Sequence, residues 1–183
     1  MSGFEPLDII DKSGKFLGMR KPRSLVHRDG DWHRTVHVWV INHKQEVLFQ
    51  KRSLQKESFP GVWDVSAAGH ISAGETSLQA AIKELAEEIG VYATEQDLTF
   101  LNTLVNQSVQ HDGAFVDNEF SDVYVLKKEI EVDTLVLQSS EVSEARYFPQ
   151  DNLRRIAETR DTAFAPHWRE YSDLHEYLSK LEE

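Results

Sequence analysis

The sequence predicts an α/β fold in which a mixed central sheet lies between layers of helices. Short β-branched and aromatic runs, separated by turn-forming residues, recur along the chain, and helical patterns occur in its middle and in its last third. Strands that have helices on both sides of them in the sequence favour a three-layer α/β/α arrangement. A chain of 183 residues is long enough for one hydrophobic core, and no linker interrupts it, so we expect a single domain over residues 1–183.

The N-terminal part of the chain predicts two pairs of strands. Residues 7–10 and 16–19 flank a turn-like cluster and predict a small hairpin. A polar segment follows at 25–32. The β-branched and aromatic run at 36–41 is then typical of a buried strand, and residues 46–50 read as its partner across a turn.

The middle of the chain predicts a loop that approaches a ligand, followed by a helix. Residues 61–69 combine small side chains with one large anchor, which suits a backbone that comes close to a bound molecule. Residues 76–89 have helical periodicity. Thr76 and Gln79 fit a capping box at the helix start, and Gly90 stands where a helix stop is expected. The apolar positions of this helix recur at spacings of three and four: Leu78, Ala81, Ile82, Leu85 and Ile89.

The C-terminal half predicts further strands and then two helices. The strand candidates are β-branched or aromatic runs, and a turn-forming triplet with glycine separates two of them. The predicted strands lie at 100–105, 118–126 and 145–148, the turn at 111–113, and the helices at 149–159 and 168–181.

Composition narrows the class of protein and of partner. The 31 acidic residues exceed the 20 basic ones, and the formal charge of −11 argues against a nucleic acid or an anionic membrane as partner. No cysteine is present, so disulfides, thiolate catalysis and cysteine-bound zinc are excluded. The first residues have neither a basic start nor an apolar stretch, and we expect a cytoplasmic protein.

Three glutamates share one side of the predicted helix. Glu84, Glu87 and Glu88 are spaced by three and four residues, so they lie on neighbouring turns and repel one another. A hard divalent cation with oxygen ligands would neutralise them. The alternative is an acidic helix face that is simply solvated.

The residues around these glutamates resemble the Nudix box, G-x5-E-x7-R-E-U-x-E-E-x-G-U, in which U is a bulky aliphatic residue. Gly69 and Glu75 occupy the first two fixed positions, and the run from Lys83 to Val91 occupies the rest. The one departure is Lys83, where the family usually has Arg; lysine keeps the charge but loses the bidentate fork, so its carboxylate partner is held more loosely. The resemblance implies an α/β/α sandwich, the same fold class that the pattern of elements predicts.

The resemblance also implies a chemistry. In such enzymes the box carboxylates hold Mg²⁺ or Mn²⁺, which bridge diphosphate oxygens and activate water for attack at phosphorus. It makes Glu84 and Glu88 the first candidates for metal ligands and Glu87 the next. The Gly69 carbonyl is a plausible backbone ligand and Glu75 a supporting residue. The general base stays open, with Glu141 and Glu144 as candidates.

Other segments resemble one branch of this superfamily, the type I isopentenyl diphosphate isomerases and the hydrolases close to them. The matching stretches lie at 33–42, 59–63, 69–70, 117–119 and 163–166. In the isomerases one divalent ion sits among three histidines and two glutamates. The resemblance places its ligands at His27, His33, His70, Asp117 and Glu119, with the first histidine pair one residue closer and Asp117 in place of a glutamate. Alternatively, each histidine is an ordinary surface or packing residue.

Hydrolysis is favoured over isomerisation. The isomerases use a cysteine and a glutamate to move protons; Glu119 matches the glutamate, but Ala68 stands at the cysteine position, and all four acidic residues of the box are present. We therefore expect a Nudix hydrolase acting on a small-molecule diphosphate, either a nucleoside diphosphate derivative or an isoprenyl diphosphate, with Trp63 or Phe164 as possible packing partners for a base or prenyl tail. An isomerase with another acid, a non-catalytic nucleotide sensor and a homodimeric assembly stay open.

Overall fold

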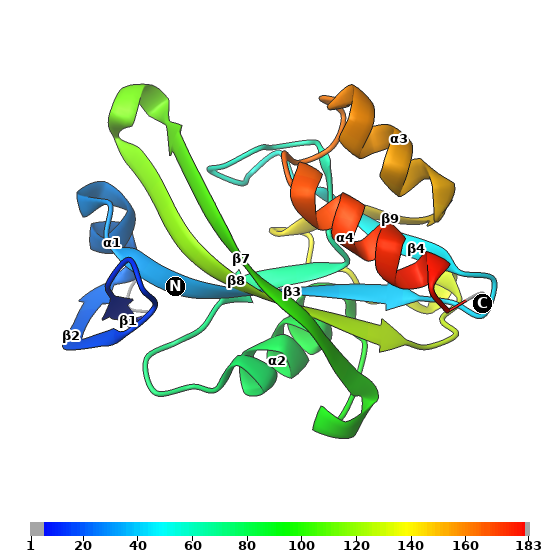
Figure 1. Cartoon of the computed structure of the whole chain (residues 1–183), viewed down its shortest axis with the longest axis horizontal. Coiled ribbons are helices and arrows are strands. Elements are labelled where there is room, and N and C mark those ends of the chain that lie inside the picture. The colour runs from blue at the N-terminus through cyan, green and yellow to red at the C-terminus, as the bar shows by residue number, and fades with distance from the viewer. Residues whose placement is uncertain (1–5, 182–183) are drawn as a thin grey trace.

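A nine-stranded mixed sheet forms the framework of the protein (Figure 1). The structure is a computed structural model, and it describes residues 6–181; the extreme N-terminal residues on which the expected location partly rests lie outside that range. Strand β3 (Trp32–Ile41) is central and pairs in parallel along its whole length with β8 (Phe115–Lys127). Its other edge pairs with the antiparallel strand β6 (Ala67–His70).

The remaining strands extend the sheet on both sides through antiparallel pairs. The hairpin of β1 and β2 joins β3 at its start, β7 pairs with β8, and β4 links β3 to β5 and β9. Their bounds are β1 (Pro6–Ile10), β2 (Phe16–Pro22), β4 (Glu46–Arg52), β5 (Trp63–Asp64), β7 (Leu98–Gln110) and β9 (Val142–Pro149).

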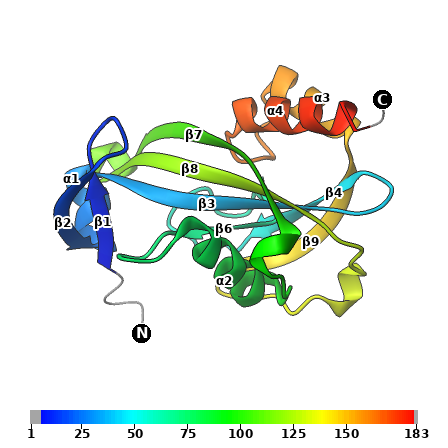
Figure 2. The same cartoon turned by 60° about the horizontal axis from the view of Figure 1, so that its bottom comes forward.

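Helices cover both faces of the sheet, as Figure 2 shows. Helix α2 (Ser77–Ile89) lies on one face, and α3 (Asp151–Thr159) and α4 (Trp168–Ser179) lie on the other. The strand period of two divides β3 between the two cores: Val36 and Val38 pack toward α2, whereas Trp39 packs toward α3 and α4. The predicted α/β/α sandwich with a mixed sheet is confirmed.

Local signals in the sequence explain the bounds of α2. The Thr76 side chain accepts a hydrogen bond from the Gln79 backbone, and the Gln79 side chain accepts one from Thr76, which completes the predicted capping box. Gly90 ends the helix in the left-handed conformation with φ of 70°, and a Cβ there would lie 2.8 Å from Val136. Glycine is therefore required at that position for two reasons.

The polar segment at 25–32, for which the sequence indicated no helix, contains one. Residues Arg23–Asp29 form helix α1, and β3 already begins at Trp32. The helix is only seven residues long and has no side-chain cap at its start, so local signals for it are weak. It is held by packing, because Val26 is fully buried against Leu7 and Ile9 of the hairpin.

The long strands are also longer than the patterns indicated. Strands β7 and β8 extend well past the runs at 100–105 and 118–126 and pair up to Gln110 and Phe115. Polar residues continue these strands because each strand supplies the backbone partners of the other. Within residues 6–181 no helix is long and apolar enough to cross a membrane.

Candidate active site

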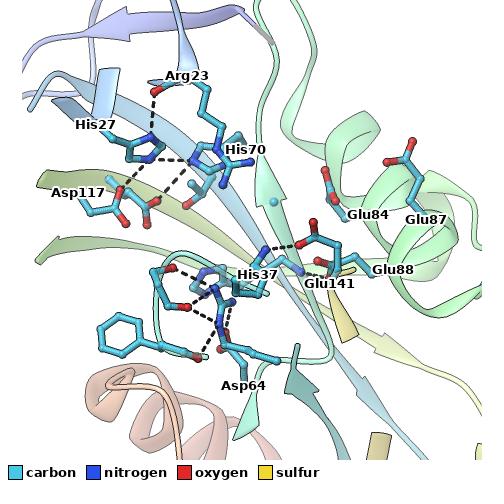
Figure 3. A pocket seen from close by; sticks show the side chains of 18 of the residues that line it. Arg23, His27, His37, Asp64, His70, Glu84, Glu87, Glu88, Asp117 and Glu141 are labelled. Atoms are coloured by element: carbon cyan, nitrogen blue, oxygen red, sulfur yellow. Dashed lines mark hydrogen bonds and ion pairs between the residues drawn. The ribbon is translucent and has the colours of Figure 1, made fainter. Parts of the chain in front are cut away.

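One cleft brings together most of the predicted site residues, although the buried His33 does not line it. It is a cavity of about 340 Å³ between the N-terminal end of β3, the loop after β4, and helix α2 (Figure 3). Carboxylates, imidazoles and basic side chains all line it. Among the lining residues are Arg23, His27, His37, Arg52, Lys56, Asp64, Gly69, His70, Glu84, Glu87, Glu88, Asp117, Glu119, Glu141 and His167.

Glu84 lies directly against the backbone of β6. A Cβ on Gly69 would come within 2.2 Å of the Glu84 carboxyl group, so this close approach requires glycine. Burial, followed by the charge of Glu88, raises the pKa of Glu84 to about 8. Its carboxylate is therefore costly in the absence of a cation, which is the behaviour expected of a metal ligand.

Glu88 is buried at the base of the same cleft and held in one orientation. One of its carboxylate oxygens accepts hydrogen bonds from the Ala68 N–H at 3.0 Å and from the Gln50 side chain at 2.8 Å. Burial raises the pKa of Glu88 to about 7 despite these donors. The solvated-face alternative fails for this residue, because only 4% of it is exposed.

The other box residues surround this pair. Lys83 bridges two carboxylates, at 3.1 Å from Glu75 and 3.5 Å from Glu84, so lysine performs the holding role that the family gives to arginine. Glu87 is exposed and lines the cleft. Of the two candidates for the general base, Glu141 lines the cleft and pairs with Lys56.

Glu144, the other candidate for the general base, lies elsewhere. It is on β9, where it forms an ion pair of 2.6 Å with Arg146, and it does not line the cleft. Trp63 and Phe164 do not line it either; both pack in or against the core under α3 and α4. The aromatic side chains in the cleft are instead Phe59 and Phe115.

The three predicted histidines meet two acids from β8. His27 comes from α1, His33 from β3 and His70 from β6, and His33 is the register partner of Glu119 in the parallel pair. The Nε2 atoms of His27 and His70 are 3.2 Å apart. His33 Nε2 lies 3.5 Å from Glu119, and His27 Nε2 lies 3.3 Å from Asp117. We name these five residues the metal-type cluster.

The metal-type cluster fits a divalent cation. His33 Nε2 and Asp117 Oδ1 are buried polar atoms without a hydrogen-bond partner, and such atoms are rare unless an ion or water completes them. Burial, together with the charge of Arg23, lowers the pKa of His70 well below its usual value, so its ring is neutral and free to act as a ligand. Nitrogen and oxygen donors together suit Mn²⁺, Zn²⁺ or Fe²⁺ better than Mg²⁺.

Sequence reasoning missed a second group of histidines and acids on another wall of the cleft. His37 Nδ1 is hydrogen-bonded to Glu170 of α4 at 2.8 Å, and Trp39 donates to the other oxygen of that carboxylate at 2.8 Å. His167 lies 3.1 Å from Asp64. Arg52 pairs with the second oxygen of Asp64 at 2.9 Å, and we name these six residues the proton-type cluster.

A signal for the proton-type cluster existed in the sequence. His37 interrupts the apolar run from Val36 to Ile41, at a position where the strand period directs it toward a core. A histidine in such a run needs a buried partner, but the sequence could not indicate that Glu170 supplies it. Arg23 was also missed; within residues 6–181 its guanidinium forms no ion pair, although it lines the cleft.

Comparison with known sequences gives the family. The NUDIX domain model matches residues 31–170. The chain is 43% identical over 166 residues to Nudix hydrolase 3 of Arabidopsis thaliana, covering 89% of this chain but only 22% of that protein. It is 36% identical to an uncharacterised Nudix hydrolase of Clostridium acetobutylicum, covering 88% and 78% of the two chains. An isopentenyl-diphosphate Delta-isomerase of Pectobacterium atrosepticum is 31% identical over 116 residues, which is 63% of this chain and 62% of that enzyme.

Solved structures share the fold at lower sequence identity. A protein of Deinococcus radiodurans superposes with a TM-score of 0.64 at 22% identity, over 84% of this chain and 90% of that one. The Nudix domain of NrtR from Shewanella oneidensis, solved with ADP ribose, gives a TM-score of 0.58 at 22% identity, over 79% and 87%. Family model, relatives and fold agree, and the chain therefore belongs to the Nudix family of hydrolases, with isopentenyl diphosphate isomerases among its relatives, as the box and its flanking motifs predicted.

Proposed function

We propose that this protein hydrolyses a diphosphate linkage in a small-molecule substrate with the help of Mg²⁺ or Mn²⁺. One observation carries the proposal: two sets of buried acidic and imidazole ligands open into the same cleft, and both are costly without a cation. The chain has a net charge of −11 and would repel a polyanionic substrate, so bound cations are needed to attract that substrate into the cleft.

Two groups of cleft residues would hold the metal ions. Glu84 and Glu88, with Glu87 at the rim and the Gly69 carbonyl beside them, would hold one or more ions. The metal-type cluster would hold another. Divalent ions held there would supply charge neutralisation for a diphosphate and a lowered pKa of bound water.

Other side chains and backbone groups of the cleft orient the metal ligands and bind the substrate. The Ala68 N–H and the Gln50 side chain fix the Glu88 carboxylate. Arg23, which has no acidic partner within residues 6–181, is free to pair with a substrate phosphate. Glu119 and Glu141, which line the cleft, are the candidates for accepting the proton of the attacking water.

Two substrate classes fit the cleft. Its polar lining and basic residues suit a nucleoside diphosphate derivative, and the structural neighbour from Shewanella oneidensis binds one such compound, ADP ribose. An isoprenyl diphosphate is the other class, supported by the relatives named as isomerases. We further propose that residues 1–183 act as one domain in the cytoplasm; a homodimer stays a prediction.

Isomerisation is the second candidate function, and the geometry of the metal-type cluster favours it. The residues that match the isomerase ligands converge around a single point. Against it, Ala68 offers no proton where the isomerases have a thiol. The two reactions are distinguished by products, because an isomerase yields an allylic diphosphate without releasing phosphate.

A release assay tests the proposal. Purified protein is incubated with nucleoside diphosphate derivatives and isoprenyl diphosphates, with Mg²⁺ or Mn²⁺, and phosphorylated products are quantified. Glu88→Gln should lower the rate by about 100-fold or more, because it removes a ligand and its charge. The control is Glu158→Gln, an exposed glutamate of α3 outside the cleft. Absence of turnover on every substrate would instead favour a non-catalytic nucleotide sensor.

A further inference from the structure

The proton-type cluster is a costly feature that hydrolysis by the box residues leaves unexplained. His37 is 5% exposed and Glu170 is 1% exposed, so an ion pair is buried between β3 and α4. Two apolar residues of similar volume would often be at least as stable in such a place. A second pair, His167 with Asp64, lies beside it, with the two imidazole rings 4.8 Å apart.

The cluster is complete except on the side that faces the cleft. Both oxygens of Glu170 are used, by His37 and Trp39, and both oxygens of Asp64 have neighbours, His167 and Arg52. Each imidazole engages its carboxylate through one ring nitrogen. The second nitrogen of each ring has no hydrogen-bond partner within residues 6–181, and both histidines line the cleft.

The geometry argues against a metal ion here, although three donor atoms of His37, His167 and Glu170 lie within 4.8 Å of one another. The contact between His37 and Glu170, at 2.8 Å, is that of a hydrogen bond with the proton in place. No side-chain atom of these residues is buried without a partner, unlike His33 and Asp117. Because His37 and Trp39 occupy both oxygens of Glu170, an ion at this place would have only the second nitrogens of the two rings as ligands, which is too few for a divalent cation.

Charge supports the same conclusion. Burial alone would lower the pKa of His37, but the charge and hydrogen bond of Glu170, with the charges of Asp64 and Glu119, together raise it to about 9, which favours a proton on both ring nitrogens. The groups that face this ring are Glu170 and His167 from α4 and its start, Asp64 from β5 and Glu119 from β8. With Arg52 included, this wall is not negative, in contrast to the rest of the cleft.

We propose that His37 and His167 form an anion subsite, in which their free ring nitrogens bind a phosphoryl oxygen of the substrate that the divalent ions do not hold. The subsite rests on the proposed function for its ligand, a diphosphate. Asp64 and Glu170 act as positioning residues, since each fixes the orientation of one ring.

Binding of methylenediphosphonate, which cannot be hydrolysed at its bridge, tests the subsite. Calorimetry in saturating Mn²⁺ compares the wild type with His167→Gln and with the control His43→Gln, a histidine outside the cleft. We expect His167→Gln to weaken binding about 10-fold, the usual effect of losing one hydrogen bond to a charged group. The control should bind as the wild type does. His37→Gln should act in the same direction, but His167→Gln is the safer variant because its side chain is partly exposed.

A count of bound Mn²⁺ per chain separates the alternatives. The subsite predicts an unchanged count in His167→Gln, whereas a lower count would make the cluster a metal site and overturn the proposal. An unchanged affinity in a folded variant would also overturn it. Because binding is measured without turnover, a wild type that binds through His167 but cleaves nothing would refute hydrolysis and leave the subsite standing.

Discussion

The cleft contains two groups of histidines and acids that use the same residue types in opposite ways. In the metal-type cluster, ring nitrogens and carboxylate oxygens face one another at 3.2 to 4.0 Å, and two buried atoms have no partner. In the proton-type cluster the contact of His37 with Glu170 is 2.8 Å, and every buried side-chain atom has a partner.

This difference in contact distances and in unpartnered atoms shows how an ion site can be recognised from the positions of its ligand atoms. Lone pairs that converge without protons between them repel, so their arrangement needs a cation. A carboxylate that accepts an N–H group at each of its oxygens already has its partners within the protein. The first cluster thus has buried atoms that need an ion or water, whereas the carboxylates of the second have their partners within the protein.

The largest expected effect concerns Glu170. Glu170→Gln leaves the buried ring of His37 without its counter-charge, and we expect a loss of about 3 kcal/mol in the free energy of unfolding. Urea denaturation measures it, with Glu158→Gln as the exposed control. The loss should be equal with and without Mn²⁺; if Mn²⁺ restored the variant, the two clusters would not differ in the way described.

In the metal-type cluster, His33→Gln is the variant to compare with Glu170→Gln. Its Nε2 atom has no partner in the metal-free protein, so the variant should change the free energy of unfolding little there. Mn²⁺ binding should instead weaken by about 10- to 100-fold or more. Calorimetric titration with Mn²⁺ measures this, and an unaltered affinity would show that the metal-type cluster does not bind the ion.

The smallest effect is a pH dependence that comes mainly from the glutamates of the box. Glu84 and Glu88 have pKa values raised to about 8 and about 7, so these groups bind more protons in the folded protein than in the unfolded chain above pH 4.5. The lowered pKa of His70 acts in the opposite direction between pH 5 and pH 6.5, and we expect a net fall in the stability of the metal-free protein of about 1 kcal/mol over this range. The pKa values of Asp64 and Glu170 are lowered, so their contributions are constant in this window.

Above pH 6.5 the His37 pair adds to the same trend. Its raised pKa means that its stabilisation is complete below pH 6.5 and is lost as pH rises through about 9. Saturating Mn²⁺ should cancel the part of the trend due to the glutamates, because ions bind their charged forms. Thermal melts at pH 5, 6.5 and 8 with and without Mn²⁺ decide this; equal slopes in the two series would contradict it.

The sequence by itself determined the fold class, helix α2 and the box. Their signals are local: a capping box at Thr76, a stop at Gly90 and carboxylates at helical spacing all act within a few turns of chain. Resemblance also identified the five residues of the metal-type cluster as ligands of one ion, and the structure brings them together. Helix α1 escaped prediction because packing on the hairpin, rather than local propensity, holds it.

Only the tertiary structure decided which charged residues share a wall of the cleft. His37 and Glu170 are separated by 133 positions, and no local pattern relates a residue in β3 to one in α4. The same holds for Glu144, which follows Glu141 by three positions in the sequence but does not line the cleft. The physical reason is that burial and pairing, which set the protonation of these groups, depend on the packing of distant elements.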